Sequence, residues 1–68
     1  MTLEKLAKLR DKYADKVRAY QDAQREEKKP SITKAKKAME RAGKTYLTAI
    51  DEAFLEHPKE DVYRVVYP

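Results

Sequence analysis

The side chains with the most evident chemistry in this sequence are the basic ones between residues 25 and 44. This stretch holds eight lysine and arginine residues against three glutamates, a local net charge of +5. The basic residues are Arg25, Lys28, Lys29, Lys34, Lys36, Lys37, Arg41 and Lys44. Such a cluster favours an anionic partner, either nucleic-acid phosphates or the carboxylates of an acidic protein. A solvated, lysine-rich helix face is the alternative that carries no function.

Three of these lysines stand where a helix disfavours positive charge. Lys34, Lys36 and Lys37 fall in the first turns of a predicted helix, where the macrodipole favours negative charge. Their placement costs stability unless an anion binds, and free amides at a helix N-terminus suit phosphate or carboxylate. Residues 51–61, by contrast, hold five acidic side chains against Lys59, a net charge of −4. The sequence therefore predicts a molecule with a basic and an acidic end.

The residues that catalysis normally uses are too few to predict an enzyme. Ser31 is the only serine, His57 is the only histidine, and a single glycine makes no phosphate-binding loop. Adjacent carboxylates such as Asp51 and Glu52 point about 100° apart on a helix instead of sharing a proton or a metal ion. His57 has too few neighbouring ligands for zinc and is better explained as a helix-end residue. We expect a non-enzymatic protein with no catalytic residues, cofactor or metal.

The apolar spacing predicts two long amphipathic helices that carry the basic cluster. Steps of three and four residues keep side chains on one helix face. The first apolar stripe is Leu3, Leu6, Leu9, Tyr13, Val17 and Tyr20. The second is Ile32, Ala35, Met39, Ala42, Tyr46, Ala49, Ile50 and Ala53. The sequence thus predicts helices over about 3–27 and 32–57, with Thr2 and Ser31 as N-caps and Pro58 ending the second helix.

A short connection predicts that the two helices lie antiparallel as a hairpin over residues 1–57. Positions equidistant from the turn then face each other, which places Tyr13 near Tyr46. Large residues of the first helix meet small ones of the second, as close packing requires. Gly43 fits as a position that a tyrosine ring or a partner backbone approaches. Glycine in a helix interior costs about 1 kcal/mol relative to alanine, so the alternative is that the helix is broken at this position.

One flank of the second helix is too apolar for a two-helix hairpin to bury. Leu47, Ile50 and Phe54 widen the stripe to one side and need cover. Residues 58–68 are dense in β-branched and aromatic side chains, which predicts an extended tail or a short strand. Either this tail or a second copy of the chain covers the flank, and a homodimer would complete a four-helix bundle. Donation of the strand to a partner's sheet is the less favoured alternative.

Composition limits the class of protein. The chain has 68 residues, 41% of them charged, a formal net charge of +4 and no cysteine. A core of this size supplies only a few kcal/mol, and neither a disulfide nor a thiolate metal site reinforces it. No apolar run approaches the roughly 20 residues of a membrane span, and the N-terminus lacks the apolar core of a signal peptide. We therefore expect one all-α domain in the cytoplasm, without membrane contact.

These observations favour a small module that occupies the surface of a partner protein with an acidic patch. Adaptors and small inhibitors, including those that phages encode, act in this way. The predicted contact residues are Arg25, Lys28, Lys29, Lys34, Lys36, Lys37, Arg41, Phe54, Leu55, Tyr63 and Tyr67. The alternative is a nucleic-acid-binding protein that uses residues 25–44 for phosphate contacts. The modest net charge and the acidic end, which a long duplex would repel, favour the protein partner.

Overall fold

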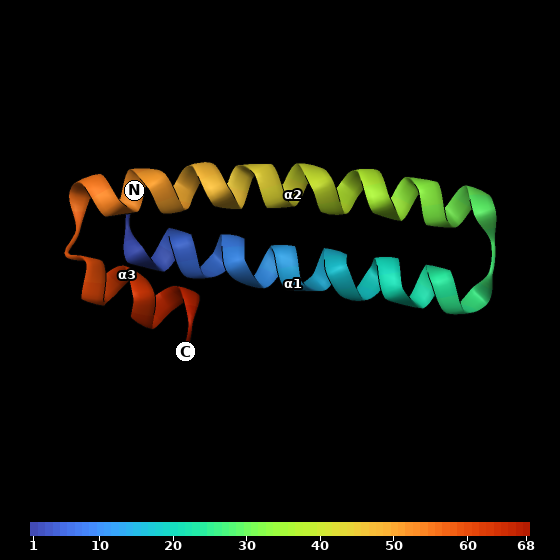
Figure 1. Ribbon diagram of the computed structural model, residues 1–68, viewed down its shortest axis with the longest axis horizontal. Helices are drawn as coiled ribbons and strands as arrows, with labels where there is room; N and C mark the ends of the chain where they lie inside the picture. The colour runs from blue at the N-terminus through green and yellow to red at the C-terminus, as the bar shows by residue number, and fades with distance from the viewer.

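The computed structural model describes all 68 residues, which form three helices and no strands. The helices are α1 (Leu3–Glu26), α2 (Lys29–Glu56) and α3 (Lys59–Val66). α1 and α2 lie antiparallel along the 43 Å length of the molecule and are joined by a tight turn, and α3 folds back at the other end (Figure 1). The all-α prediction is confirmed, with 88% of the chain in helices.

The ends of α1 follow from local side-chain chemistry. The Thr2 hydroxyl accepts a hydrogen bond from the backbone N–H of Lys5 at 3.1 Å, which confirms Thr2 as the N-cap. Glu4 in the first turn and Arg25 in the last turn complement the helix macrodipole. The residue after the helix, Glu27, takes the left-handed conformation with a φ of 56°. This conformation turns the chain towards α2.

α2 begins at Lys29, earlier than predicted, and the prediction that Ser31 caps it is wrong. The cap position is Lys28, whose side chain makes no capping hydrogen bond, and Pro30 lies within the first two helical positions. Proline suits this place because its fixed φ is helical and its missing N–H would have no partner there. The helix therefore starts before the serine. α2 ends as predicted, with His57 as the C-cap ahead of a proline.

The C-terminal residues form a helix, so the predicted extended tail or short strand over 58–68 is wrong. A lone strand here has no partner for its backbone groups, whereas a helix pairs them internally. Helical spacing also brings Val62, Val65 and Val66 to the hairpin, where Val62 is fully buried. Two acidic residues in the first turn and an arginine in the last turn complement the macrodipole.

The core lies at the end of the hairpin where the two termini and α3 meet. Its buried members are Leu6, Tyr46, Ala49, Ala53 and Val62. The predicted register of α1 on α2 is confirmed, because the rings of Tyr13 and Tyr46 lie 6.0 Å apart between centroids. In the half of the hairpin next to the turn, Ala23 is the one buried side chain. The turn half is therefore held by a thin, partly exposed seam.

Gly43 lies within an unbroken α2. A Cβ added to this glycine would lie 3.1 Å from Cε1 of Tyr13, closer than side chains normally pack. The tyrosine ring thus occupies the space that a side chain would need. This contact confirms the prediction that a ring approaches the glycine.

α3 covers part of the flank that the sequence left without a partner. Ile50 and Phe54 are partly buried against the core, and the Phe54 ring meets the ring of Tyr63 edge-on at 5.5 Å. Leu47, nearer the turn, remains 64% exposed. A single chain therefore closes its own core at this end. The four-helix bundle of two copies stays a prediction.

Candidate functional site

The basic residues predicted to contact a partner are all exposed and lie in the turn half of the hairpin. Arg25 forms an ion pair with Asp22, with 3.9 Å between nitrogen and oxygen. The others have no carboxylate oxygen within 4.0 Å: Lys28, Lys29, Lys34, Lys36, Lys37 and Arg41. Six exposed cations are thus free to bind an anion.

These cations divide between the two flanks of α2. Lys34 and Arg41 are seven residues apart, so they lie two turns apart on the same flank. Lys29 and Lys36 have the same spacing and lie on the opposite flank. The two pairs are matched in charge and separation but differ in what surrounds them.

A groove runs between α1 and α2 on the flank of Lys34 and Arg41. Its middle is a hollow of about 270 Å³, lined by Leu9, Lys12, Lys16, Ala38, Arg41 and Ala42 together with Thr45. A hollow of about 240 Å³ continues it towards the turn, shares Lys16 and Ala38, and adds Lys34. A hollow of about 420 Å³ continues it towards the termini, shares Leu9, and adds Lys44 and Glu52. We call this continuous feature the cationic groove.

The cationic groove has an apolar floor and a positively charged rim. The floor is made of small side chains and one leucine: Leu9, Ala19, Ala35, Ala38 and Ala42. The rim carries five cations: Lys12, Lys16, Lys34, Arg41 and Lys44. None of the five forms an ion pair, and Glu52, near the termini, is the one acidic residue that lines the groove.

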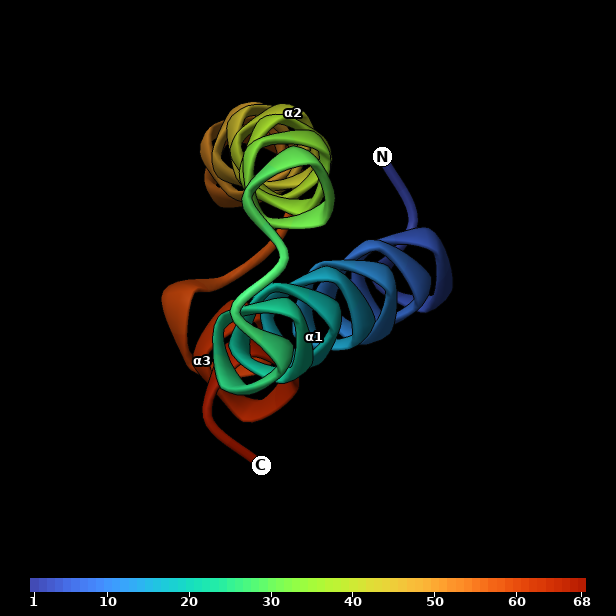
Figure 2. The same cartoon turned by 90° about the vertical axis from the view of Figure 1, so that its right-hand side faces the viewer.

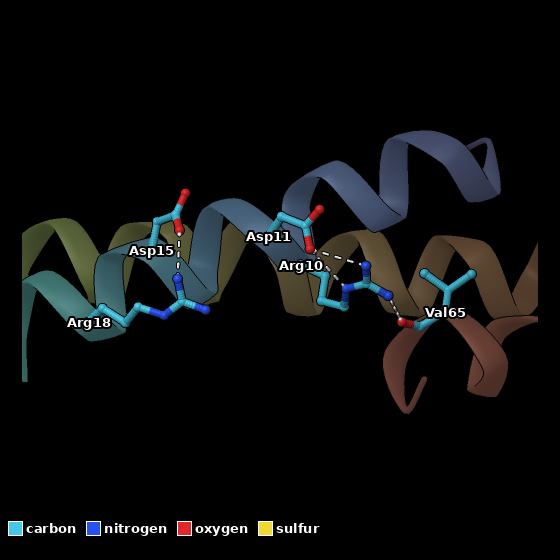
Figure 3. Close-up of polar contacts among 5 residues, drawn as sticks. All are labelled: Arg10, Asp11, Asp15, Arg18 and Val65. Atoms are coloured by element: carbon cyan, nitrogen blue, oxygen red, sulfur yellow. Dashed lines mark hydrogen bonds and ion pairs between the residues drawn. The ribbon is translucent and has the colours of Figure 1, made fainter.

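The acidic residues of α1 do not neutralise this rim. Asp15 pairs with Arg18 at 3.8 Å and Asp11 pairs with Arg10 at 3.1 Å (Figure 3). Positions 11, 15 and 22 share the outer face of α1, away from α2. The three aspartates of α1 therefore pair with arginines away from the groove, and the groove keeps its positive charge.

The cationic groove and α3 lie on opposite sides of the hairpin. In the view from the turn, α3 and the N-terminus lie on opposite sides of α1 and α2 (Figure 2). Met1 lines the terminal end of the groove. On the other side, the Arg10 guanidinium donates a hydrogen bond to the backbone carbonyl of Val65 in α3. One side of the seam is thus covered by a helix, and the other is open.

The N-terminal residue closes one end of the groove. The Met1 amino group donates a hydrogen bond to the carboxylate of Glu56, and the Met1 carbonyl oxygen accepts one from Nε2 of His57 at 2.8 Å. The hydrogen bond and charge of the ammonium group lower the pKa of Glu56 below its ordinary value of 4.5. His57 thus holds the N-terminus at the end of α2, which agrees with the helix-end interpretation.

The predicted apolar contact residues lie far from the basic ones. Phe54, Tyr63 and Tyr67 form a row of rings between α2 and α3, with 6.3 Å between the two tyrosine centroids. Leu55 is 88% exposed and points about 100° away from Phe54, so it does not join them. α3, which carries Tyr63, lies at the end of the hairpin opposite the turn (Figure 1), whereas the basic set lies in the turn half. The structure therefore separates the predicted residues into two surfaces.

A buried hydroxyl in the core has no hydrogen-bond partner. The Tyr46 hydroxyl is enclosed near the junction of the three helices, and no group accepts or donates a bond to it. Burial raises the pKa of Tyr46 above 10.0, against the opposing effect of the Arg10 charge. This neutral hydroxyl costs stability because it is buried without a hydrogen-bond partner.

The predicted contact residues omit three cations of the groove: Lys12 and Lys16 of α1, and Lys44, which belongs to the predicted basic cluster only. A usable signal was present for Lys16, because the antiparallel register sets position 16 opposite positions 42–43 and therefore beside Arg41. Lys12 lies one turn earlier on the same flank of α1. The groove becomes visible only when both helices are considered together.

A metal site and a membrane span are two further classes of site, and a relative among known proteins would be another guide to function. No three histidine, aspartate or glutamate side chains lie close enough together to hold a metal ion. None of the helices combines the length and apolar content needed to cross a bilayer. No protein-family model, curated protein or solved structure matches the chain. The chemistry of its surfaces is therefore the basis for a functional assignment.

Proposed function

We propose that this protein is a non-enzymatic interaction module that binds an acidic surface of a partner protein through the cationic groove. The observation that carries the proposal is the unpaired rim of the groove. Five cations converge there without an ion pair, while the aspartates of α1 pair elsewhere. Carboxylates from a partner would complete this arrangement, as in adaptors and inhibitors that act by occupying a surface.

The cost of this arrangement in the free protein supports a binding role. Like charges held close together repel each other, and α2 has no acidic residue in its first turn to complement its macrodipole. Because α2 begins at Lys29, the predicted placement of Lys34, Lys36 and Lys37 in its first turns is wrong. The cations at the positive end of the helix are Lys28, at the cap position, and Lys29. Partner carboxylates would relieve both penalties, so binding would be favoured and salt-sensitive.

Nucleic acid is the second candidate, because the same cations would also attract phosphates. In its favour, Lys29 and Lys36 lie unpaired outside the groove, so positive charge surrounds the turn. Against it, the exposed rings Tyr63 and Tyr67 lie at the far end, away from the cations, where they cannot stack on bases held at the turn. We therefore place the protein partner first.

A homodimer remains part of the proposal. A hollow of about 470 Å³ on the outer side of α2 is lined by Tyr13, Met39, Gly43 and Leu47 together with three basic residues and Glu40. The exposed Leu47 is an apolar surface that a second copy would cover. Light scattering on the wild type and on a Leu47→Lys variant tests this point, because a dimer through this surface would dissociate in the variant.

Binding of two defined polyanions tests the proposed function. We would measure the affinity of the labelled protein for poly-glutamate and for a short mixed-sequence duplex between about 50 and 200 mM salt. The proposal predicts tighter binding to the polycarboxylate near physiological salt. Tighter binding to the duplex throughout would move the function to nucleic acid. Failure to bind either polymer at low salt would refute the proposal.

A further inference from the structure

We propose that the cationic groove binds one acidic, amphipathic α-helix of a partner protein, lying along α1 and α2 on the side opposite α3. This inference rests on the proposed function and names the structural class of the partner. It has three supports: the shape of the groove, the use that the chain makes of the other side of its seam, and the charges on the rim.

The shape of the groove fits a helix. Two helices packed side by side leave a furrow along each side of their seam, and the ridges of a third helix fit such a furrow. The floor here consists of Leu9 and alanines, whose small side chains let another backbone approach closely. The three hollows share residues and run along the hairpin as one elongated feature, which suits an extended ligand better than a compact one.

The chain already uses the opposite side of its seam in this way. α3 lies there, buries Val62 completely, and packs Val65 and Val66 against the core. A helix with apolar residues on one face is therefore an occupant that this hairpin accommodates. The groove on the other side lacks such an occupant and has an apolar floor of its own.

The charges on the rim specify an acidic helix. From Lys34 to Lys44 the rim spans ten residues of α2, which is about 15 Å or three turns of a partner helix. Carboxylates at three- and four-residue spacing on the partner would face Lys16 and Arg41 while apolar side chains between them reach the floor. Glu52 lies at the terminal end, so the acidic part of the partner would lie towards the turn.

The test uses a synthetic peptide as the probe. It is an acetylated and amidated peptide of about 18 residues, built from glutamate, alanine and leucine with the leucines along one face, long enough to form a helix. One control replaces each glutamate with glutamine. A second control has the same composition with the leucines scattered around the helix. We expect the acidic amphipathic peptide to bind about tenfold more tightly than either control.

Two matched double variants locate the binding surface. Lys34→Gln with Arg41→Gln removes two charges from the groove, and Lys29→Gln with Lys36→Gln removes two charges from the opposite flank with the same spacing. All four side chains are exposed and unpaired, so both variants should fold, which circular dichroism checks. We expect the groove variant to weaken binding about tenfold and the control variant to weaken it less than about twofold.

The outcomes separate the groove from the proposed function. Equal losses in the two variants, or equal binding of the scattered peptide, would overturn the groove as a helix site while leaving an acidic partner in place. No binding of the acidic peptide or of poly-glutamate would overturn both. A duplex that displaces the peptide and binds more tightly would make nucleic acid the ligand. A mass that doubles without peptide, and falls to that of one chain in the groove variant, would make a second copy the occupant.

Discussion

Replacement of Gly43 with alanine tests how the seam of the hairpin is packed. In the interior of a helix alanine is favoured over glycine by about 0.8 to 1 kcal/mol, so an unobstructed substitution would raise the free energy of unfolding by that amount. The new Cβ would lie 3.1 Å from Cε1 of Tyr13 and 3.7 Å from its Cδ1 and Cζ. The ring must therefore move by a few tenths of an ångström, which disturbs its contact with Tyr46.

The gain in free energy of unfolding from Gly43→Ala is therefore smaller when Tyr13 is present. Tyr13 is partly exposed, so its ring has room to move, and we expect Gly43→Ala to raise the free energy of unfolding by less than about 0.5 kcal/mol. In a Tyr13→Ala background the obstruction is absent and the same substitution should give the full gain of about 1 kcal/mol. Urea denaturation followed by circular dichroism measures the free energy of unfolding of the wild type, the two single variants and the double variant, which together form a double-mutant cycle. Equal gains in both backgrounds would refute the close approach of the ring to the glycine.

Three further substitutions have defined outcomes. Tyr46→Phe should raise the free energy of unfolding by about 1 kcal/mol, because it removes a buried hydroxyl without a partner; a loss measured by urea denaturation would mean that the hydroxyl is bonded. Glu27→Gly should raise the thermal midpoint, since glycine accepts a φ of 56° without strain, whereas a lowered midpoint would contradict the left-handed turn. Glu56→Gln should abolish an acid-dependent contribution to stability. Because the folded-state pKa of Glu56 lies below its ordinary value of 4.5, that contribution is present above pH 4.5 and is lost as pH falls through the lowered value. The denaturation midpoints of wild type and variant are compared across this pH range. A difference that is the same at every pH would argue against the ion pair between Glu56 and the N-terminus.

The two long helices were predictable because their signal is repeated along many turns. Each apolar stripe persists for several turns, and the short connection leaves an antiparallel arrangement as the simple solution. The register followed from the position of the turn, which is why Tyr13 faces Tyr46 as predicted. The start of α2 was misassigned because Ser31 is a good cap residue, while Pro30, the better start signal here, directly precedes it.

The C-terminal helix was not predictable from local propensity. Valine and tyrosine favour strands because they pack well on a pleated surface, and the tail is rich in both. A helix as short as α3 gains its stability from packing, here through the buried Val62 and its neighbours. The segment also carries local helix signals, namely Pro58 ahead of an acidic first turn and valines at helical spacing. The β-propensity outweighed these signals in the prediction, and the contact with the hairpin decides for the helix.

The basic surface was predictable from composition, but the groove within it was not. A count of charges along the sequence does not distinguish Lys34 and Arg41, which line the groove, from Lys29 and Lys36, which lie outside it. The groove arises because one flank of α1 and one flank of α2 come together, which depends on how each helix is rotated about its axis. The register could place Lys16 at the level of Arg41, but the rotation of the two helices brings both side chains to the same groove.

The most direct test of the central claim is to map where the acidic amphipathic peptide binds. Amide chemical shifts of the isotope-labelled protein would be recorded by NMR during a titration with the peptide. A helix seated in the cationic groove predicts the largest changes at Lys16, Ala38 and Arg41, with little change at Lys36 or in α3. Small changes spread evenly over every lysine, or changes centred on α3, would contradict it.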